Sequence, residues 1–311
     1  MAKRRGILAG LVAAPWIARA AGRIPAVGIE SQYADVIAAV GGDRVEVAAI
    51  ETNPNADPHG FEASPAVARL IATARLVVLN GLGYDSWARR IIGATAGGAT
   101  AGSAGGRHVI AAQAVLGLPD ATRNPHVWYG PAAMPAVAAA IAQALAAIDP
   151  AGASVYRRNL AAFGASLAPW RAAIGAFRAQ HPGIRAAVTE PVGNDLFRAM
   201  GIGIATPWSL QAAVMNGTDP APQDIAAQEA LLRRREVSFL GYNRQVIGPL
   251  TRAMLDAARA ARVPVVALYE TMPAGFHFGF WMLAETAAVA RAVAHGTSTS
   301  ALVAGEARTA G

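Results

Sequence analysis

The sequence of 311 residues contains no cysteine. This absence excludes disulfide bonds, thiolate chemistry, zinc sites built from cysteine and a lipid anchor attached through cysteine. An exported protein of this length can be stable without disulfides, because its core is large enough. We therefore expect a soluble protein that is not tethered to a membrane by a lipid.

Long blocks of like charge and low-complexity repeats are also missing, and 54% of the residues are hydrophobic, which excludes a disordered chain. The formal net charge is +7, but four basic residues lie in the first 20 positions, and +3 remains without them. Beyond those positions the one run of basic residues is Arg233–Arg235. Nucleic-acid binding needs a basic stripe, so we expect no nucleic-acid partner.

The N-terminus has the pattern of an export signal. The basic residues Lys3 to Arg5 precede a short apolar run at 6–17, and Ala18-Arg19-Ala20 forms an A-x-A cleavage site. The alternative is a membrane anchor, but the apolar run is well short of the roughly 20 residues that span a bilayer. No later segment has the pattern of a span. We predict a periplasmic protein with a signal peptide at 1–20, exported by the general or the twin-arginine route.

Beyond the signal, short apolar runs alternate with alanine-rich helical stretches. Continuous apolar runs joined by helices are typical of α/β units with buried parallel strands. The expected strands cover 24–29, 45–50, 76–79, 108–110, 186–190, 237–242 and 264–268. Expected helices include 30–40, 65–73, 132–146 and 251–261. The sequence thus predicts an α/β fold in which two sets of strands form two lobes.

A long helical segment, about 151–179, lies between the two sets of strands. Its large apolar residues recur at alternating intervals of four and three from Tyr156 to Phe177, which is one continuous helical face. Pro169 should kink the helix, because it removes one backbone donor. A helix of this length would join the lobes as a stiff strut. The expected units are a signal peptide (1–20), an N-terminal metal-binding lobe (21–147), a linking helix (148–180), a C-terminal metal-binding lobe (181–300) and a tail (301–311).

Four residues with metal-binding side chains lie at or beyond the ends of expected strands, two in each half. They are His59, His126, Glu190 and Glu270. Ligands of open α/β sheets bind beyond the carboxyl ends of the strands, so these side chains should meet between the lobes. Imidazole nitrogen and carboxylate oxygen form a ligand set that suits zinc, manganese or ferrous iron. The sequence predicts a site for one such divalent ion.

Each of these residues also has a simpler interpretation. A histidine in a loop is often a surface residue, whereas a carboxylate at the end of an apolar strand is costly unless it is paired or bound to a metal. His277, in an apolar run seven residues after Glu270, is an alternative fourth ligand. A ligating histidine needs an acceptor for its second nitrogen, and Asp57 and Glu62 are candidates for His59.

At these residues the chain resembles the zinc/manganese cluster of ABC-transporter solute-binding proteins. Residues 57–62 (DPHGFE) resemble the first metal motif of the family, Asp-Pro-His-x-Tyr-Glu, and 124–128 (NPHVW) the second, Asp-Pro-His-x-Trp. Glu190 falls where members carry His or Glu, and Glu270 where they carry Asp or Glu. Further support comes from 219–222 (DPAP), 242–245 (YNRQ) and Trp281-Met282, which are similar to one branch of the family.

The resemblance implies two lobes, each with a parallel four-stranded sheet flanked by helices, joined by one long rigid helix. It implies that His59 and His126 from the first lobe, with Glu190 and Glu270 from the second, bind the transported zinc or manganese ion. The implied partners are an ABC importer permease with its ATPase, and the protein should be a monomer without enzymatic activity. Residues 97–107 are rich in Gly and Ala, so the long His-rich loop of some zinc importers is missing.

Two other classes of function remain open at this point. A metal-dependent hydrolase could use the same His/Glu site, with Glu270 as a general base and an open position on the metal. Against it, the sequence has no H-E-x-x-H pair and no nucleophile elbow. A binding protein for a small molecule without metal is the third possibility. The sequence does not choose between zinc, manganese and iron.

Overall fold

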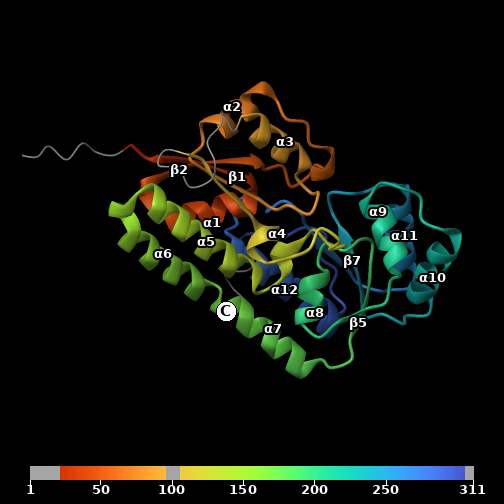
Figure 1. Cartoon of the computed structure of the whole chain (residues 1–311). Helices are drawn as coiled ribbons and strands as arrows, with labels where there is room; N and C mark the ends of the chain where they lie inside the picture. Colours follow the sequence, from red (N-terminus) through yellow and green to blue (C-terminus); the bar gives the residue numbers. More distant parts are fainter. Residues whose placement is uncertain (1–21, 96–105, 305–311) are drawn as a thin grey trace, which may run out of the picture.

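The computed structural model describes residues 22–95 and 106–304 and contains two parallel four-stranded sheets flanked by helices (Figure 1). The α/β fold with two such sheets, expected from the sequence, is confirmed. The expected signal peptide lies outside the described residues. So do most of the Gly/Ala-rich stretch 97–107 and most of the tail.

The first sheet has the strand order β2-β1-β3-β4. Its strands are β1 (Ile24–Glu30), β2 (Val45–Glu51), β3 (Leu76–Leu79) and β4 (His108–Ala111). Alternate residues of β3 face two different cores: Leu76 and Val78 pack in one hydrophobic cluster, Val77 and Leu79 in another. Burial on both faces explains why the strand is a continuous apolar run.

Helices connect the strands of the first half and cover both faces of its sheet. They are α1 (Ser31–Gly41), α2 (Pro65–Thr73), α3 (Ser86–Ala94), α4 (Ala112–Val115) and α5 (Ala133–Ile148), with short 3-10 turns η1 (Gly42–Arg44), η2 (Pro58–Gly60) and η3 (Val127–Tyr129). Ser64 caps the first turn of α2, because its Oγ accepts the backbone N–H of Val67 and Pro65 needs no acceptor.

The second sheet repeats the order of the first as β6-β5-β7-β8. Its strands are β5 (Arg185–Val188), β6 (Gly203–Ile204), β7 (Phe239–Asn243) and β8 (Val265–Leu268). The helices are α8 (Asn194–Ala199), α9 (Trp208–Met215), α10 (Pro222–Arg233), α11 (Pro249–Ala260) and α12 (Phe278–His295). The sequence pattern missed β6, since a strand of two residues shows no alternation.

The predicted connector is present as a bent helix of 31 residues, from Pro150 to Gln180. It comprises η4 (Pro150–Gly152), α6 (Ala153–Ser166) and α7 (Ala168–Gln180). The regular helix is interrupted at Leu167, two residues before Pro169, as the missing backbone donor of proline predicts.

This connector packs against both halves of the molecule (Figure 1). Asn159 of α6 donates a hydrogen bond to the carbonyl of Val40 in α1, and the indole of Trp170 in α7 donates to Thr286 in α12. By length and mean hydropathy alone the segment could cross a bilayer. Its large apolar side chains are instead buried in the shared core, so it is a structural element of the fold.

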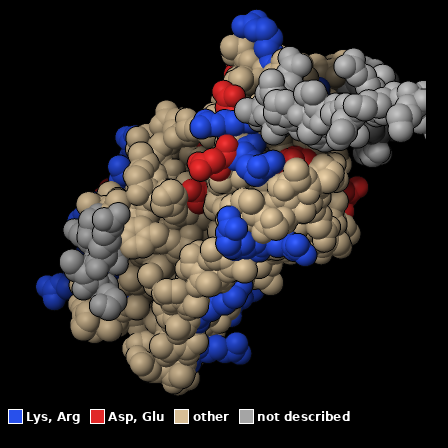
Figure 2. Space-filling view, turned by 90° about the vertical axis from the view of Figure 1, so that its left-hand side faces the viewer, with Lys and Arg blue, Asp and Glu red and all other residues tan. Residues whose placement is uncertain are grey.

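The charged side chains do not form a continuous basic surface on the face drawn in Figure 2. Lys and Arg fall into separate groups there, and near the middle they adjoin Asp and Glu. In the structure Arg44 and Asp149 form an ion pair, with 2.6 Å between Nη2 and Oδ2. This face therefore lacks the basic stripe that nucleic-acid binding requires.

A buried carboxyl group, that of Glu285 in α12, lies where the two halves meet. Its Oε1 accepts hydrogen bonds from the Tyr129 hydroxyl of the first half and from the Trp281 indole. Tyr129 also donates to the carbonyl of Tyr269 in the second half, at 2.9 Å. Burial raises the pKa of Glu285 from 4.5 to about 8, against these hydrogen bonds. The group is therefore protonated at neutral pH.

We expect the substitution Glu285→Gln to stabilise the metal-free protein more at pH 9 than at pH 5. A carboxyl with a raised pKa in the folded state contributes full stability below 4.5 and loses it as the pH rises through 8. A rise in pKa from 4.5 to about 8 corresponds to a loss of roughly 5 kcal/mol at most in the free energy of unfolding. Urea unfolding at both pH values measures the difference, with the exposed Glu229→Gln as control. Equal effects at both pH values would contradict the expectation.

Candidate metal site

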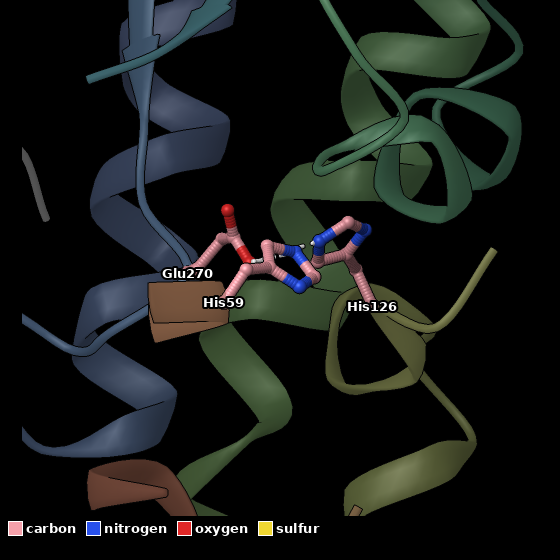
Figure 3. Close-up of side chains that lie close together, drawn as sticks. All are labelled: His59, His126 and Glu270. Atoms are coloured by element: carbon pink, nitrogen blue, oxygen red, sulfur yellow. Dashed lines mark hydrogen bonds and ion pairs between the residues drawn. The ribbon is translucent and has the colours of Figure 1, made fainter. Parts of the chain in front are cut away.

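Three of the four predicted ligands meet where the two sheets face each other. His59 lies in η2 after β2, His126 precedes η3 in the first half, and Glu270 follows β8 in the second half. One ligand atom of each lies within 4.8 Å of the others. Figure 3 shows the carboxylate of Glu270 pointing toward both imidazole rings. The loops after three strands thus bring three metal-binding groups together.

The three side chains form direct contacts. The Nε2 atom of His126 lies 3.1 Å from Oε2 of Glu270, and the Nε2 atom of His59 lies 3.4 Å from the same oxygen. The side chains of His126 and Glu270 are fully buried, whereas 29% of the His59 side chain is exposed. Among these three side chains, solvent therefore reaches the cluster at His59.

Charge on the cluster is set by the mutual influence of these groups. Burial raises the pKa of Glu270, but His126 and His59 outweigh this effect and hold the pKa well below its usual range. Burial lowers the pKa of His59, and the Glu270 carboxylate outweighs it, so the net pKa is above 6.5. Each of these two contacts needs a proton on the Nε2 atom of the imidazole, and a metal cation between the three groups could take the place of these protons.

Glu270 is held by residues from both halves. The hydroxyl of Tyr84 donates to Oε2 at 2.8 Å, and the side-chain amide of Asn243 donates to Oε1. The Gln32 side chain donates to the backbone carbonyl of Glu270 at 3.3 Å. These donors fix the orientation of the carboxylate before any ion binds.

Gln245 connects the loop that carries Glu270 with the loop that carries His59. Its Oε1 accepts the backbone N–H groups of Glu270 and Thr271, at 2.6 and 2.9 Å. Its Nε2 donates to the carbonyl of Ala56, three residues before His59, at 2.6 Å. Gln245 thus links the Glu270 loop of the second half to the His59 loop of the first half by hydrogen bonds.

The two histidines differ in how their second nitrogen is held. Nδ1 of His126 lies 2.8 Å from Oδ1 of Asn124, which also accepts the His126 backbone N–H. For His59 the sequence pointed to Asp57 and Glu62. Asp57 instead accepts the backbone N–H of His59, at 2.8 Å, and within the described residues no hydrogen bond reaches Nδ1 of the His59 ring. The first imidazole is thus less firmly oriented than the second.

Glu190, the fourth predicted ligand, lies just beyond β5 and is 2% exposed. Neither carboxylate oxygen has a hydrogen-bond partner within the described residues, and Glu190 is not among the three groups within 4.8 Å. Burial raises its pKa well above 4.5, and the charge of Glu270 raises it further. An unpartnered buried carboxyl beside a carboxylate is costly, unless a proton or a cation compensates it.

His277 lies apart from the cluster. Its side chain is 89% exposed, and its Nδ1 lies 2.6 Å from Oδ1 of Asp35. The residue precedes α12, and the second oxygen of Asp35 accepts the backbone N–H of Phe278 at the start of that helix. In this structure the pair of Asp35 and His277 orients the start of α12.

Further buried carboxyls surround the site in the first half. Glu30 and Glu51 are the last residues of β1 and β2, and Asp85 precedes α3. Burial raises the pKa of Glu51 to about 8, against the hydrogen bond from Trp87. The pKa of Glu30 is raised well above 4.5 by burial and then by Asp85 and Glu51. Burial also raises the pKa of Asp85, against the hydrogen bonds that its carboxylate accepts from the backbone N–H groups of Asn80 and Gly81. Glu51, with a pKa of about 8, therefore holds a proton at neutral pH.

The roles of three residues at this site were not found by reasoning from the sequence, although 242–245 was noted there for its resemblance to the family. Tyr84, Asn243 and Gln245 all contact Glu270 or its backbone, yet none is a typical metal ligand. Tyr84 belongs to the segment Asn80–Asp85, which follows an expected strand and contains two glycines. That segment was the available signal, because glycines after a strand mark backbone that approaches a site closely.

Comparison with known proteins gives a family match. The family model described as zinc-uptake complex component A, periplasmic, matches residues 30–292. A protein of Treponema pallidum (strain Nichols) that is named as metal-binding is 26% identical over 154 residues, which cover 44% of this chain. The matched part spans 46% of the length of that curated relative.

Solved structures match nearly the whole described chain. The periplasmic zinc-binding protein TroA from Treponema pallidum has a TM-score of 0.72 and 17% identity, with 89% of this chain and 100% of that chain covered. A crystal structure of ZnuA has a TM-score of 0.70 and 20% identity over 88% and 100% of the two chains. FpvC from Pseudomonas aeruginosa, solved with Mn²⁺, has a TM-score of 0.68 and 23% identity over 87% and 98%. At these identities the matches establish the fold.

Proposed function

Since the chain belongs to the family of periplasmic zinc-uptake components, we propose that it captures one divalent transition-metal ion, zinc or manganese, and delivers it to an ABC importer. The family consists of substrate-binding proteins, so the hydrolase alternative is excluded. The metal is the transported cargo in this proposal. The ligands are His59, His126, Glu190 and Glu270, two from each half.

The observation that carries the proposal is the convergence of His59, His126 and Glu270 within 4.8 Å, with Glu190 buried and unpartnered. A metal ion would replace the protons that lie between Glu270 and the two imidazoles. It would also compensate the carboxylate of Glu190, whose pKa is raised by burial and by the charge of Glu270. Two imidazoles and two carboxylates suit zinc, manganese and ferrous iron. The ion would thereby join residues 21–147 to residues 181–300 across the connector at 148–180.

Binding must compete with protons at the same atoms. The pKa of His59 is raised, so protons compete at a higher pH than they would for an isolated histidine. Metal affinity should therefore fall as the pH drops through the range of this imidazole. This pH dependence suits release of the metal ion as well as its capture, since a small change in the pKa of His59 shifts the balance between bound protons and bound metal.

A permease with its ATPase would recognise the loaded state. The connector packs against both halves, which opposes a wide hinge motion. Gln245 ties the Glu270 loop to the His59 loop, so a loop rearrangement in the second half is the favoured signal. Metal-free and metal-loaded structures with identical loops in the second half would contradict this part of the proposal.

The direct test is metal content and binding of the purified mature protein. After treatment with a chelator, it is titrated with zinc and with manganese in a buffer that does not bind metal, and elemental analysis follows gel filtration. We expect one ion per chain, with zinc bound more tightly, following the general affinity order. The exposed His295→Ala serves as control. No retained ion and no metal-dependent change in melting would overturn the proposal and leave the metal-free binding protein.

A further inference from the structure

A cavity of about 460 Å³ opens onto the metal site from the side of His59. Its wall includes Tyr84 and Arg123 of the first half and Trp208 and Asn216 of the second. A bare ion needs a small fraction of this space, and the volume equals that of roughly fifteen water molecules. It falls within the range of about 300–1,000 Å³ that small-molecule sites occupy. The cavity is thus large enough for a molecule beside the metal.

The cavity wall carries one arginine. Arg123 contributes a guanidinium to the lining, and within the described residues it forms no ion pair with a carboxylate. The guanidinium of this exposed residue lies 6.0 Å from the centroid of the Trp208 ring of the second half, which is within reach of a cation–π contact. A positive charge at this place attracts an anion.

The backbone of the lining adds a donor. Leu82 has a φ of 56° between two glycines with φ of 89° and 80°, a conformation that is rare for a residue with a side chain. The N–H of Leu82 donates to Gln113, whereas the N–H of Gly83, which lines the cavity, has no acceptor among residues 22–95 and 106–304. Gly83 is exposed, so its N–H is open to a ligand that enters the cavity.

On the metal side, the charge is already balanced. If Glu190 and Glu270 both bind as carboxylates, they neutralise a divalent ion, and the imidazoles add no charge. An anion that binds to the ion from the cavity then needs a cation of its own. Arg123 is the charged side chain of the lining that can supply it, because guanidinium and carboxylate form paired hydrogen bonds.

We propose that the cavity binds a small polycarboxylate together with the metal, one carboxylate on the ion beside His59 and another on Arg123. The cargo would then be a metal chelate rather than a bare ion. This inference rests on the proposed metal-binding function and names its substrate class more closely. It assigns to Arg123 a role in recognition of the anion, with no role in holding the metal itself.

The test uses zinc and citrate with the mature protein. Zinc-loaded protein, freed of excess zinc, and metal-free protein are each titrated with citrate in a calorimeter. We expect saturable binding of one citrate to the zinc-loaded form, and none to the metal-free form. Acetate, which has a single carboxylate and cannot bridge, should bind at least tenfold more weakly. Elemental analysis after the titration shows whether the zinc remains on the protein.

Substitution separates the anion from the metal. Arg123→Gln should weaken citrate binding by tenfold or more and change zinc affinity without citrate by less than twofold, whereas the exposed Arg171→Gln should change neither. If citrate only removes zinc, equally from all variants, the cargo is the bare ion and the inference is wrong. The inference is also wrong if the Arg123→Gln variant binds citrate as tightly as the wild type. Failure of zinc itself to bind would instead overturn the proposed function.

Discussion

Stabilisation by zinc is expected to disappear when His126 is replaced with alanine. In the wild type, zinc at one hundred times its dissociation constant should raise the free energy of unfolding by about 2.7 kcal/mol. His126 is fully buried, its Nδ1 is held by Asn124, and its Nε2 faces Glu270. Loss of a residue that only orients a ligand weakens metal binding about 10- to 100-fold, so loss of a ligand should cost at least on the order of 100-fold.

The metal-free protein should be destabilised by the same substitution. His126 is the largest of the influences that lower the pKa of Glu270, and without it a buried carboxylate keeps fewer cationic partners. Thermal melts with and without zinc measure both effects, and His295→Ala is the matched control on the surface. A full zinc-dependent shift in His126→Ala would show that His126 is not a ligand.

Replacement of Glu190 with glutamine is expected to have effects of opposite sign on stability and on binding. The pKa of Glu190 is raised, so its stability contribution is complete below 4.5 and is lost as the pH rises through its value in the folded state. Glutamine cannot ionise, so the metal-free variant should be more stable than the wild type at pH 8, by on the order of 1–3 kcal/mol. Zinc affinity should fall on the order of 100-fold.

Urea unfolding of metal-free protein at pH 5 and pH 8, and zinc titration at pH 8, give the two quantities. Glu229→Gln, in an exposed position of α10, is the control for loss of a carboxylate. Wild-type zinc affinity in Glu190→Gln would remove Glu190 from the ligand set. A gain in stability that accompanies weaker binding would show a carboxyl kept for function at the expense of the fold.

A comparison of the connector and the strands shows where sequence patterns are reliable. The alternating intervals from Tyr156 to Phe177 specify one helical face, and the structure buries Tyr156, Phe163, Trp170 and Phe177 on it. The bend near Pro169 followed from the missing donor alone. The expected strand at 186–190 ends earlier, at Val188, so that Glu190 lies in the following loop. Periodicity locates a strand well but not its last residue.

The local sequence determined the α/β class, the helical connector with its bend and the strand-end positions of the metal-binding side chains, because apolar periodicity, proline and strand length act over a few residues. Only the tertiary structure decided which groups meet. Tyr84, Asn243 and Gln245 reach Glu270 from segments up to 186 positions away, and Arg123 reaches Trp208 across the two halves. Such contacts depend on how two separately formed sheets face each other, and no short-range pattern records that arrangement.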